Sequence, residues 1–188
     1  AGFDRVFASL GTRPAPMLDV LKPAAGDIAR AADALGARTV IVLPNHKNVV
    51  MAALQAVSLA RCHLIVVPTE SLPQGIAAAV VFDPIADPAE LAEEMEEARG
   101  EVTTVEITVA PADRRADGVS VHAGDAIALV NGKLILKAST PGDALVRALN
   151  RVAESTAGLV TIYGGADIDE TTLDRSGGNV RALLRDCM

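Results

Sequence analysis

The sequence predicts an α/β fold, in which a parallel-sheet subdomain with flanking helices is followed by a smaller α+β subdomain. Two consecutive segments, 39–57 and 64–81, share one plan: an apolar run, a polar turn with a proline, and a helical pattern. Strands that are apolar on both faces and alternate with helices are typical of parallel sheets covered on both sides. Near residue 100 the spacing of apolar residues changes from helical to alternating. We therefore divide the chain into 1–100 and 101–188.

The first subdomain is predicted to hold helices around two buried strands. Helical spacing of apolar residues begins at Phe3, and a helix over 27–35 is expected to stop at Gly36. The strands are expected over 39–43 and 64–67, and their helices over 49–57 and 72–81. A last helix begins at Asp87, which can cap it ahead of Pro88 and Glu90, and its apolar stripe is Leu91, Met95 and Ala98.

The second subdomain is predicted to begin with a strand whose Val105, Ile107 and Val109 share one face. A polar turn over 112–118 and a hairpin at Asn131-Gly132 follow, since Asn-Gly favours the tight turns that join antiparallel strands. A helix is expected to start at Thr140-Pro141. Residues 159–162 are expected to form a third buried strand, followed by an acid-rich helix.

Composition and charge exclude several classes of function. The net charge of −7, the absence of tryptophan and the single tyrosine argue against nucleic-acid binding. Cys62 and Cys187 are the two cysteines, so a disulfide framework is not expected. We expect the protein to belong to the reducing cytoplasm. No run reaches the ~20 apolar residues of a membrane span. Because the chain opens at Ala1 without methionine, we expect it to be a piece of a longer polypeptide.

Polar side chains in the two strand-to-helix turns are the first candidates for ligand binding. Parallel strands end at one edge of a sheet, where helix-start amides attract anions. The candidate residues are Asn45, His46, Lys47, Asn48, Thr69, Ser71, Gln74 and Gly75.

The structural alternative for the first turn is that Asn45 caps the helix while His46 and Lys47 are solvated. We favour it there, because no partner base, nucleophile or metal ligand is fixed by the spacing around His46. For the second turn, a proline-shaped helix cap with Gly75 for close packing is as well supported as a binding site. Cys62-His63 points to opposite faces of a strand and predicts no catalytic pair.

An acidic helix is the second candidate surface. Opposite its apolar stripe it carries Glu90, Glu93, Glu94, Glu96 and Glu97, with Arg99 nearby. Such a face is usually only solvated. A concentrated negative patch is also suited to steering a basic partner.

Several spaced motifs together resemble the C-terminal domain of the bacterial fatty-acid kinase subunit, the family built on a dihydroxyacetone-kinase-like N-terminal domain. The resemblance covers about residues 25–165. The matching motifs are Val42-Leu43-Pro44-Asn45, Lys47-Asn48, Val67-Pro68-Thr69, Pro73-Gln74-Gly75, Asp83-Pro84, Met95-Glu96-Glu97-Ala98, Asp117-Gly118, Gly124-Asp125 and Gly132-Lys133.

The resemblance implies a recognition domain. In the family, ATP and magnesium belong to the N-terminal kinase domain, and a linker domain supplies dimerisation and further catalytic residues. The C-terminal domain is similar in fold to DegV-type fatty-acid-binding proteins and docks the acyl-loaded fatty-acid-binding subunit through an acidic surface. We therefore expect no catalytic residue, metal or cofactor in this part, and a homodimeric, cytoplasmic parent chain that is an ATP-dependent fatty-acid kinase of phospholipid synthesis.

Two alternatives stay open beside docking. As in the DegV-type proteins, the domain could itself carry a fatty acid or small anion, with Thr69, Gln74 or Asn45 holding the carboxylate. An enzyme that uses His46 is the other alternative. Segment 12–17 departs from the family's pattern. The chain also stops at Met188, before the family's final Gly-rich strand, so the last strand of the second subdomain is expected to be missing.

Overall fold

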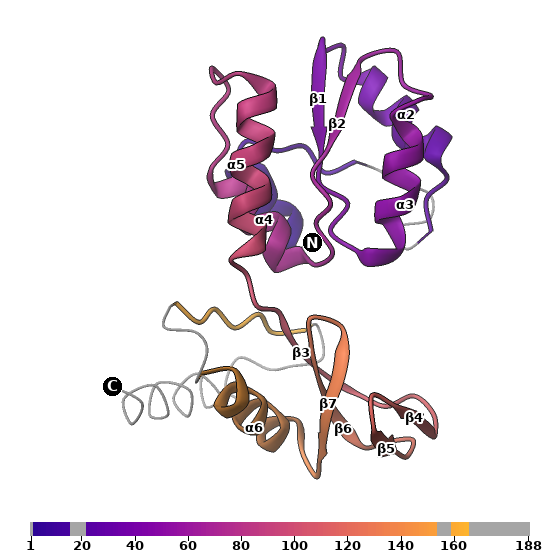
Figure 1. Cartoon of the computed structure of the whole chain (residues 1–188), viewed down its shortest axis with the longest axis vertical. Helices are drawn as coiled ribbons and strands as arrows, with labels where there is room; N and C mark the ends of the chain where they lie inside the picture. The colour runs from indigo at the N-terminus through magenta and orange to yellow at the C-terminus, as the bar shows by residue number, and fades with distance from the viewer. Residues whose placement is uncertain (1, 16–21, 154–158, 166–188) are drawn as a thin grey trace. The chain divides into compact units, whose positions relative to one another are not determined.

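The computed structural model describes residues 2–15, 22–153 and 159–165, which fall into two compact units (Figure 1). The first unit is Ala1–Val102 and the second is Thr103–Met188. The chain is mixed α/β, as the sequence predicts. Each unit has its own sheet and its own clusters of buried apolar residues.

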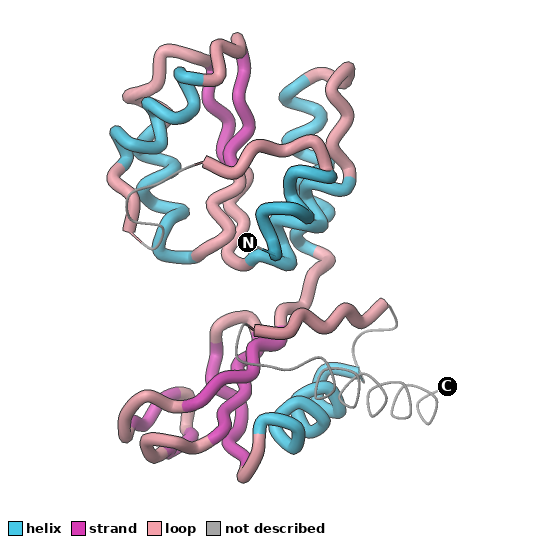
Figure 2. Tube along the Cα trace, turned by 180° about the vertical axis from the view of Figure 1, so that it is seen from behind, coloured by secondary structure: helices cyan, strands magenta, loops and turns pink. Residues whose placement is uncertain are grey.

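The first unit is a parallel pair of strands with helices on both faces. Strands β1 (Thr39–Val42) and β2 (His63–Val66) pair in parallel. The helices of this unit are α1 (Gly2–Ser9), α2 (Ala25–Ala34), α3 (Lys47–Ala56), α4 (Leu72–Val80) and α5 (Pro88–Gly100). Helices α2 and α3 lie on one side of the strands, and α4 and α5 lie on the other (Figure 1, Figure 2).

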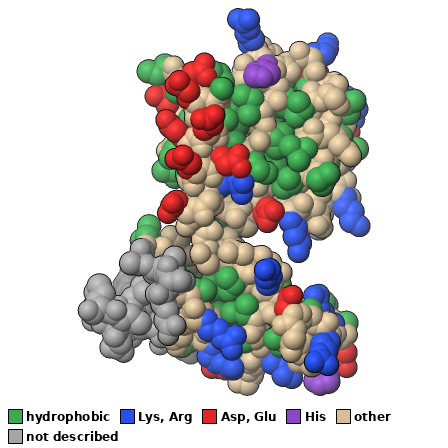
Figure 3. All heavy atoms as spheres, viewed as in Figure 1, with side chains coloured by type: hydrophobic (Ala, Val, Ile, Leu, Met, Phe, Trp, Pro, Cys, Tyr) green, Lys and Arg blue, Asp and Glu red, His purple; other side chains and the backbone are tan. Residues whose placement is uncertain are grey.

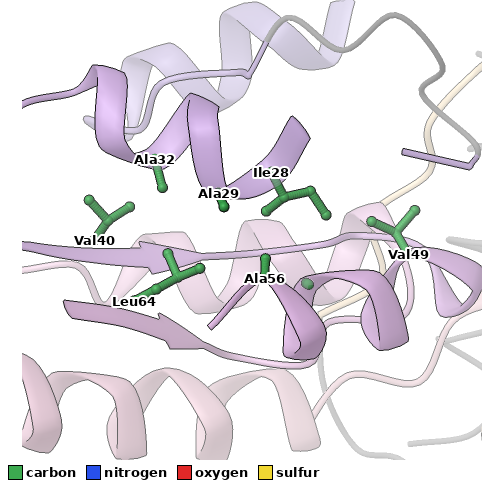
Figure 4. Close-up of a cluster of buried hydrophobic side chains, with 8 residues drawn as sticks. Ile28, Ala29, Ala32, Val40, Val49, Ala56 and Leu64 are labelled. Carbon is green, nitrogen blue, oxygen red and sulfur yellow. The ribbon is translucent and has the colours of Figure 1, made fainter. Parts of the chain in front are cut away.

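Alternating side chains of β1 and β2 hold the two helical layers. Val40 and Leu64 are partners across the sheet, and both are buried against α2 and α3 in the cluster drawn in Figure 4. The next residue along β1, Ile41, packs in the cluster on the opposite face, where Leu91 and Met95 of α5 are buried. Successive side chains of a strand point to opposite faces, so one short strand supplies both layers. The predicted stripe of Leu91 and Met95 is therefore confirmed.

The second unit is an antiparallel sheet with a helix on one face. Strands β3 (Val105–Val109), β6 (Ala126–Val130) and β7 (Lys133–Ala138) pair in the order β3-β6-β7. Helix α6 (Pro141–Ala153) buries Ala144 and Ala148 against Ala128 and Leu136. On its other face the sheet carries the hairpin of β4 (Arg114–Ala116) and β5 (Val119–Val121), whose Val121 packs with Ile127.

The predicted Asn131-Gly132 hairpin is confirmed, and it joins β6 to β7. Both residues have positive φ, 48° for Asn131 and 76° for Gly132, as a type I′ turn requires. Asp117 and Gly118 repeat this pattern, with φ of 51° and 82°. They join β4 to β5, so the 112–118 segment expected to be only a turn contains a short strand.

The strand predicted over 159–162 is wrong. The structure assigns no strand to residues 159–165, and Leu159 is 94% exposed. A run of apolar residues signals burial only where a neighbouring strand or helix covers it, which the spacing of the sequence does not specify. The acid-rich helix expected after Gly165 lies outside the described residues.

Candidate functional site

The two strand-end turns meet at one edge of the parallel pair. The Asn45 backbone N–H donates a hydrogen bond to Thr69 Oγ1 at 2.9 Å. The Thr69 hydroxyl in turn donates to Asn45 Oδ1, also at 2.9 Å. Thr69 is fully buried and is the buried polar residue of the described core. Two turns that are 24 residues apart in the sequence are thus joined by a reciprocal pair of hydrogen bonds.

Gly75 completes this contact because it has no side chain. A Cβ at Gly75 would lie 1.9 Å from Asn45 Oδ1, so the carboxamide of Asn45 occupies the space over the first turn of α4. Asn45 itself has a φ of 58°, a conformation that asparagine adopts more readily than most residues. The position at the start of α4, where an anion would lie, is therefore filled by the chain's own amide group.

His46 caps α3, and the predicted cap at Asn45 is wrong. The Asn48 backbone N–H donates to His46 Nδ1 at 3.1 Å. Asn45 is turned instead toward Thr69, because its left-handed backbone conformation directs its side chain to the neighbouring turn. Lys47 and Asn48 are exposed. The structure therefore gives His46 a structural task as the cap of α3.

The second turn is likewise held by its own side chains. Ser71 caps α4, since its Oγ accepts from the Gln74 backbone N–H at 3.4 Å. The Glu70 backbone N–H donates to Gln74 Oε1 at 2.7 Å. Of the predicted candidates, the structure thus places Asn45 against Thr69 and Gly75, while Lys47 and Asn48 lie exposed beside them. The two hydrogen bonds between Asn45 and Thr69 are partly buried, whereas the bonds that His46 and Gln74 accept are exposed.

Cys62 is not activated as a nucleophile. It is half-buried, and desolvation raises the pKa of its thiol, with the Asp33 carboxylate adding to the effect. The thiolate is the nucleophilic form of cysteine, so a raised pKa lowers its population near neutral pH. Asp33, which sequence reasoning missed, accepts hydrogen bonds from the backbone N–H groups of Arg61 and Cys62. It ties α2 to the start of β2 and lines a shallow depression there.

The acidic surface, defined as Glu90, Glu93, Glu94, Glu96 and Glu97, is placed by the packing of α5. All of these side chains are exposed, on the side of the helix away from its two buried residues. Figure 3 shows acidic side chains gathered where α5 lies. Glu96 of this surface forms an ion pair with Arg99 at 2.7 Å.

The start of α5 is fixed by the cap that the sequence predicts. Asp87 Oδ1 accepts from the backbone N–H groups of Ala89 at 2.9 Å and Glu90 at 3.3 Å. Pro88 occupies the first turn, where a missing N–H is harmless. The Asp87 cap thus fixes where α5 begins, and the burial of Leu91 and Met95 fixes which face of the helix is packed against the unit.

Neither a metal centre nor a membrane-spanning helix is found in the described ranges. Among residues 2–15, 22–153 and 159–165, no group of His, Cys, Asp and Glu side chains is arranged to hold a metal ion. None of the helices in these ranges combines the length and apolar character needed to cross a bilayer.

Comparison with known proteins agrees with the motifs. A family model for the C-terminal region of FakA-like fatty acid kinase subunits matches residues 1–182. Proteins from Staphylococcus aureus strains USA300 and NCTC 8325 / PS 47, both described as uncharacterized, are 28% identical to the chain over 174 residues. The match covers 92% of this chain and 32% of each relative, so the chain spans about a third of the length of these curated relatives. The chain thus belongs to the family of C-terminal domains of FakA-like fatty acid kinase subunits.

Proposed function

We propose that this chain is the recognition domain of a fatty-acid kinase and docks an acyl-loaded, DegV-type fatty-acid-binding protein through the acidic surface of α5. The observation that carries the proposal is an exposed helix face made almost entirely of glutamate, in a chain that belongs to a fatty-acid kinase family. A surface of one charge sign accelerates association with a partner of the opposite sign. The carrier partner is therefore expected to present lysine and arginine to α5.

The spacing of the glutamates supports a role beyond solubility. Glu93 and Glu97 are one helical turn apart, as are Glu90 and Glu94, and like charges at this spacing destabilise a helix by about 0.2–0.5 kcal/mol per pair. Arg99 pairs with Glu96 and leaves those two repulsions in place. A basic partner would relieve them on binding, which adds to its affinity.

The strand-end turns support a carrier function less well. Asn45 and Thr69 bond to each other, and the Gln74 carboxamide oxygen accepts from the backbone of its own turn. A fatty-acid carboxylate would have to displace these bonds to reach the same groups. Docking is therefore the better supported of the two functions.

We also assign ATP, magnesium and acyl-phosphate formation to other parts of a longer, homodimeric parent chain in the cytoplasm. Support comes from the curated relatives, which extend far beyond the matched region. Within the described residues, Cys62 is not activated and His46 is engaged as a helix cap. On this proposal the domain presents the carrier, with its acyl carboxylate, to the kinase.

Charge reversal at one glutamate tests the docking surface. Glu93→Lys is expected to slow association with the carrier several-fold at low salt, and to have little effect at high salt, where screening shortens the range of the attraction. Glu106→Lys is the matched control, because Glu106 is exposed on β3 in the other unit and its reversal changes the net charge equally. Equal slowing by both variants would show a net-charge effect and would contradict a docking surface on α5.

The same variant separates binding from folding. Glu93→Lys removes a repulsion with Glu97 and adds an attraction, so the free energy of unfolding is expected to rise by about 0.4–1 kcal/mol. Urea denaturation measures this change. A variant that is at least as stable as the wild type but binds more slowly has lost an interaction surface and not its fold.

A further inference from the structure

An exposed apolar turn lies immediately before the acidic helix. Ile85, in the connection between α4 and α5, is 91% exposed. Val80, the last residue of α4, is 63% exposed, and Phe82 is 38% exposed. Single exposed apolar residues are ordinary. Because nearly the whole side chain of Ile85 is exposed, however, its burial contributes almost nothing to the stability of the fold.

The turn that carries Ile85 is held in one conformation by its neighbours. The Ile85 backbone N–H donates to Asp83 Oδ1 at 3.0 Å, and the Ala86 N–H donates to the Asp83 carbonyl at 3.3 Å. Asp87 ends the turn by capping α5. Ile85 is thus presented by an ordered turn, which reduces the entropy lost when a partner covers it.

Phe82 anchors the other end of the turn. Two carbons of its ring lie 3.6 Å from the position that a Cβ on Gly11 would take, so the ring rests against the end of α1. The part of Phe82 that is not in contact remains open to solvent beside the turn. The apolar surface of the turn therefore has a fixed base within the first unit.

Acidic residues border Ile85 in the turn and continue into α5. Asp83 and Asp87 flank Ile85 in the sequence, and Glu90 follows one helical turn later; all three are exposed. Figure 3 shows hydrophobic side chains among the acidic ones on the side where α5 lies. Stable protein interfaces combine an apolar centre with a polar rim. An apolar tip bordered by carboxylates fits a recess bordered by lysine and arginine.

We propose that Ile85, supported by Val80 and Phe82, is the apolar anchor of the docking surface, and that it enters an apolar recess with a basic rim on the partner. The proposal rests on the proposed docking function and assigns a different task to each part of the surface. The glutamates of α5 attract the partner and set the association rate. Ile85 holds the partner and sets the dissociation rate, because a few residues that fill desolvated pockets near the centre of an interface carry most of its binding energy.

Ile85→Ser tests the anchor, with the acyl-loaded DegV-type fatty-acid-binding protein of the same organism as the probe. We expect Kd to rise about tenfold or more through faster dissociation, at low and at high salt alike. Ile85→Leu keeps an apolar tip and is expected to bind within about threefold of the wild type. Both changes are at an exposed position, so the far-UV circular dichroism spectrum should not change.

Met51→Ser is the matched control. Met51 is 64% exposed on α3, which lies on the opposite face of the β1–β2 pair (Figure 1). A loss of affinity for Ile85→Ser with unchanged affinity for Met51→Ser supports the anchor. Wild-type affinity for Ile85→Ser, or an equal loss for Met51→Ser, overturns the anchor while leaving docking intact. Absence of binding by the wild-type chain overturns docking and the anchor together.

Discussion

Replacing Gly75 by alanine tests the contact between the two strand-end turns. The added Cβ would lie 1.9 Å from Asn45 Oδ1 and 2.6 Å from its Cγ, so the carboxamide must move. The buried Thr69 hydroxyl then loses its acceptor, at a cost of about 1–3 kcal/mol. Alanine is favoured over glycine inside a helix by about 0.5–1 kcal/mol. We expect Gly75→Ala to lower the free energy of unfolding by about 1 kcal/mol.

A second background makes this prediction specific. Asn45→Gly keeps the positive φ of position 45 and removes the side chain that would clash. In that background Gly75→Ala is expected to be stabilising by about 0.5–1 kcal/mol, since only the helix preference remains. Urea denaturation followed by circular dichroism measures all four proteins, because the chain has no tryptophan. The same destabilisation in both backgrounds would refute the contact between Asn45 and Gly75.

Three further predictions concern caps, turns and pH. Asp87→Ala should lower the free energy of unfolding by about 1 kcal/mol, and Asp87→Asn by less, as urea denaturation can show, because asparagine still caps α5. Gly132→Ala should cost about 1 kcal/mol in the same assay, because φ at this position is 76°. The pKa of Asp125 is lowered by the His122 backbone N–H and then by Lys137, so its contribution to stability is present above its unfolded pKa of about 4 and is lost as pH falls through the lower folded value. Acid titration of Asp125→Asn should therefore show a smaller loss of stability below pH 4 than the wild type, and an equal loss would contradict the assignment.

The elements of the first unit could be predicted because their sequence signals are local. The strand-turn-helix pattern, the Asp87 cap and the Leu91 and Met95 stripe each depend on residues within one or two helical turns of one another. The Asn131-Gly132 hairpin is equally local. Such signals do not depend on which elements pack against each other, so the elements that they predict are present in the structure.

The contact at the centre of the strand-end site could not be predicted, because it joins residues 24 positions apart. It depends on the parallel pairing that brings the ends of β1 and β2 together. Part of the signal was present: proline followed by asparagine is typical of a type II turn, whose third residue needs a positive φ. Reading Pro44-Asn45 in this way would have removed Asn45 as the cap of α3 and left that task to His46.

The exposure of Ile85 could not be predicted from its neighbours in the sequence either. Ile85 follows an Asp-Pro pair and precedes a helix cap, and neither feature says whether an apolar residue there is covered. The failed strand over 159–162 has the same origin, since apolar character alone does not identify a packing partner. Burial is a property of the assembled fold, and it is burial that distinguishes Leu91 from Ile85.

Titration calorimetry of this chain against its organism's acyl-loaded DegV-type fatty-acid-binding protein, at low and high salt, tests the docking proposal most directly. The proposal predicts saturable binding that weakens as salt screens the acidic surface, with a salt-resistant remainder that Ile85→Ser weakens about tenfold or more. Absence of binding at both salt concentrations would contradict the proposal that this domain recognises the carrier.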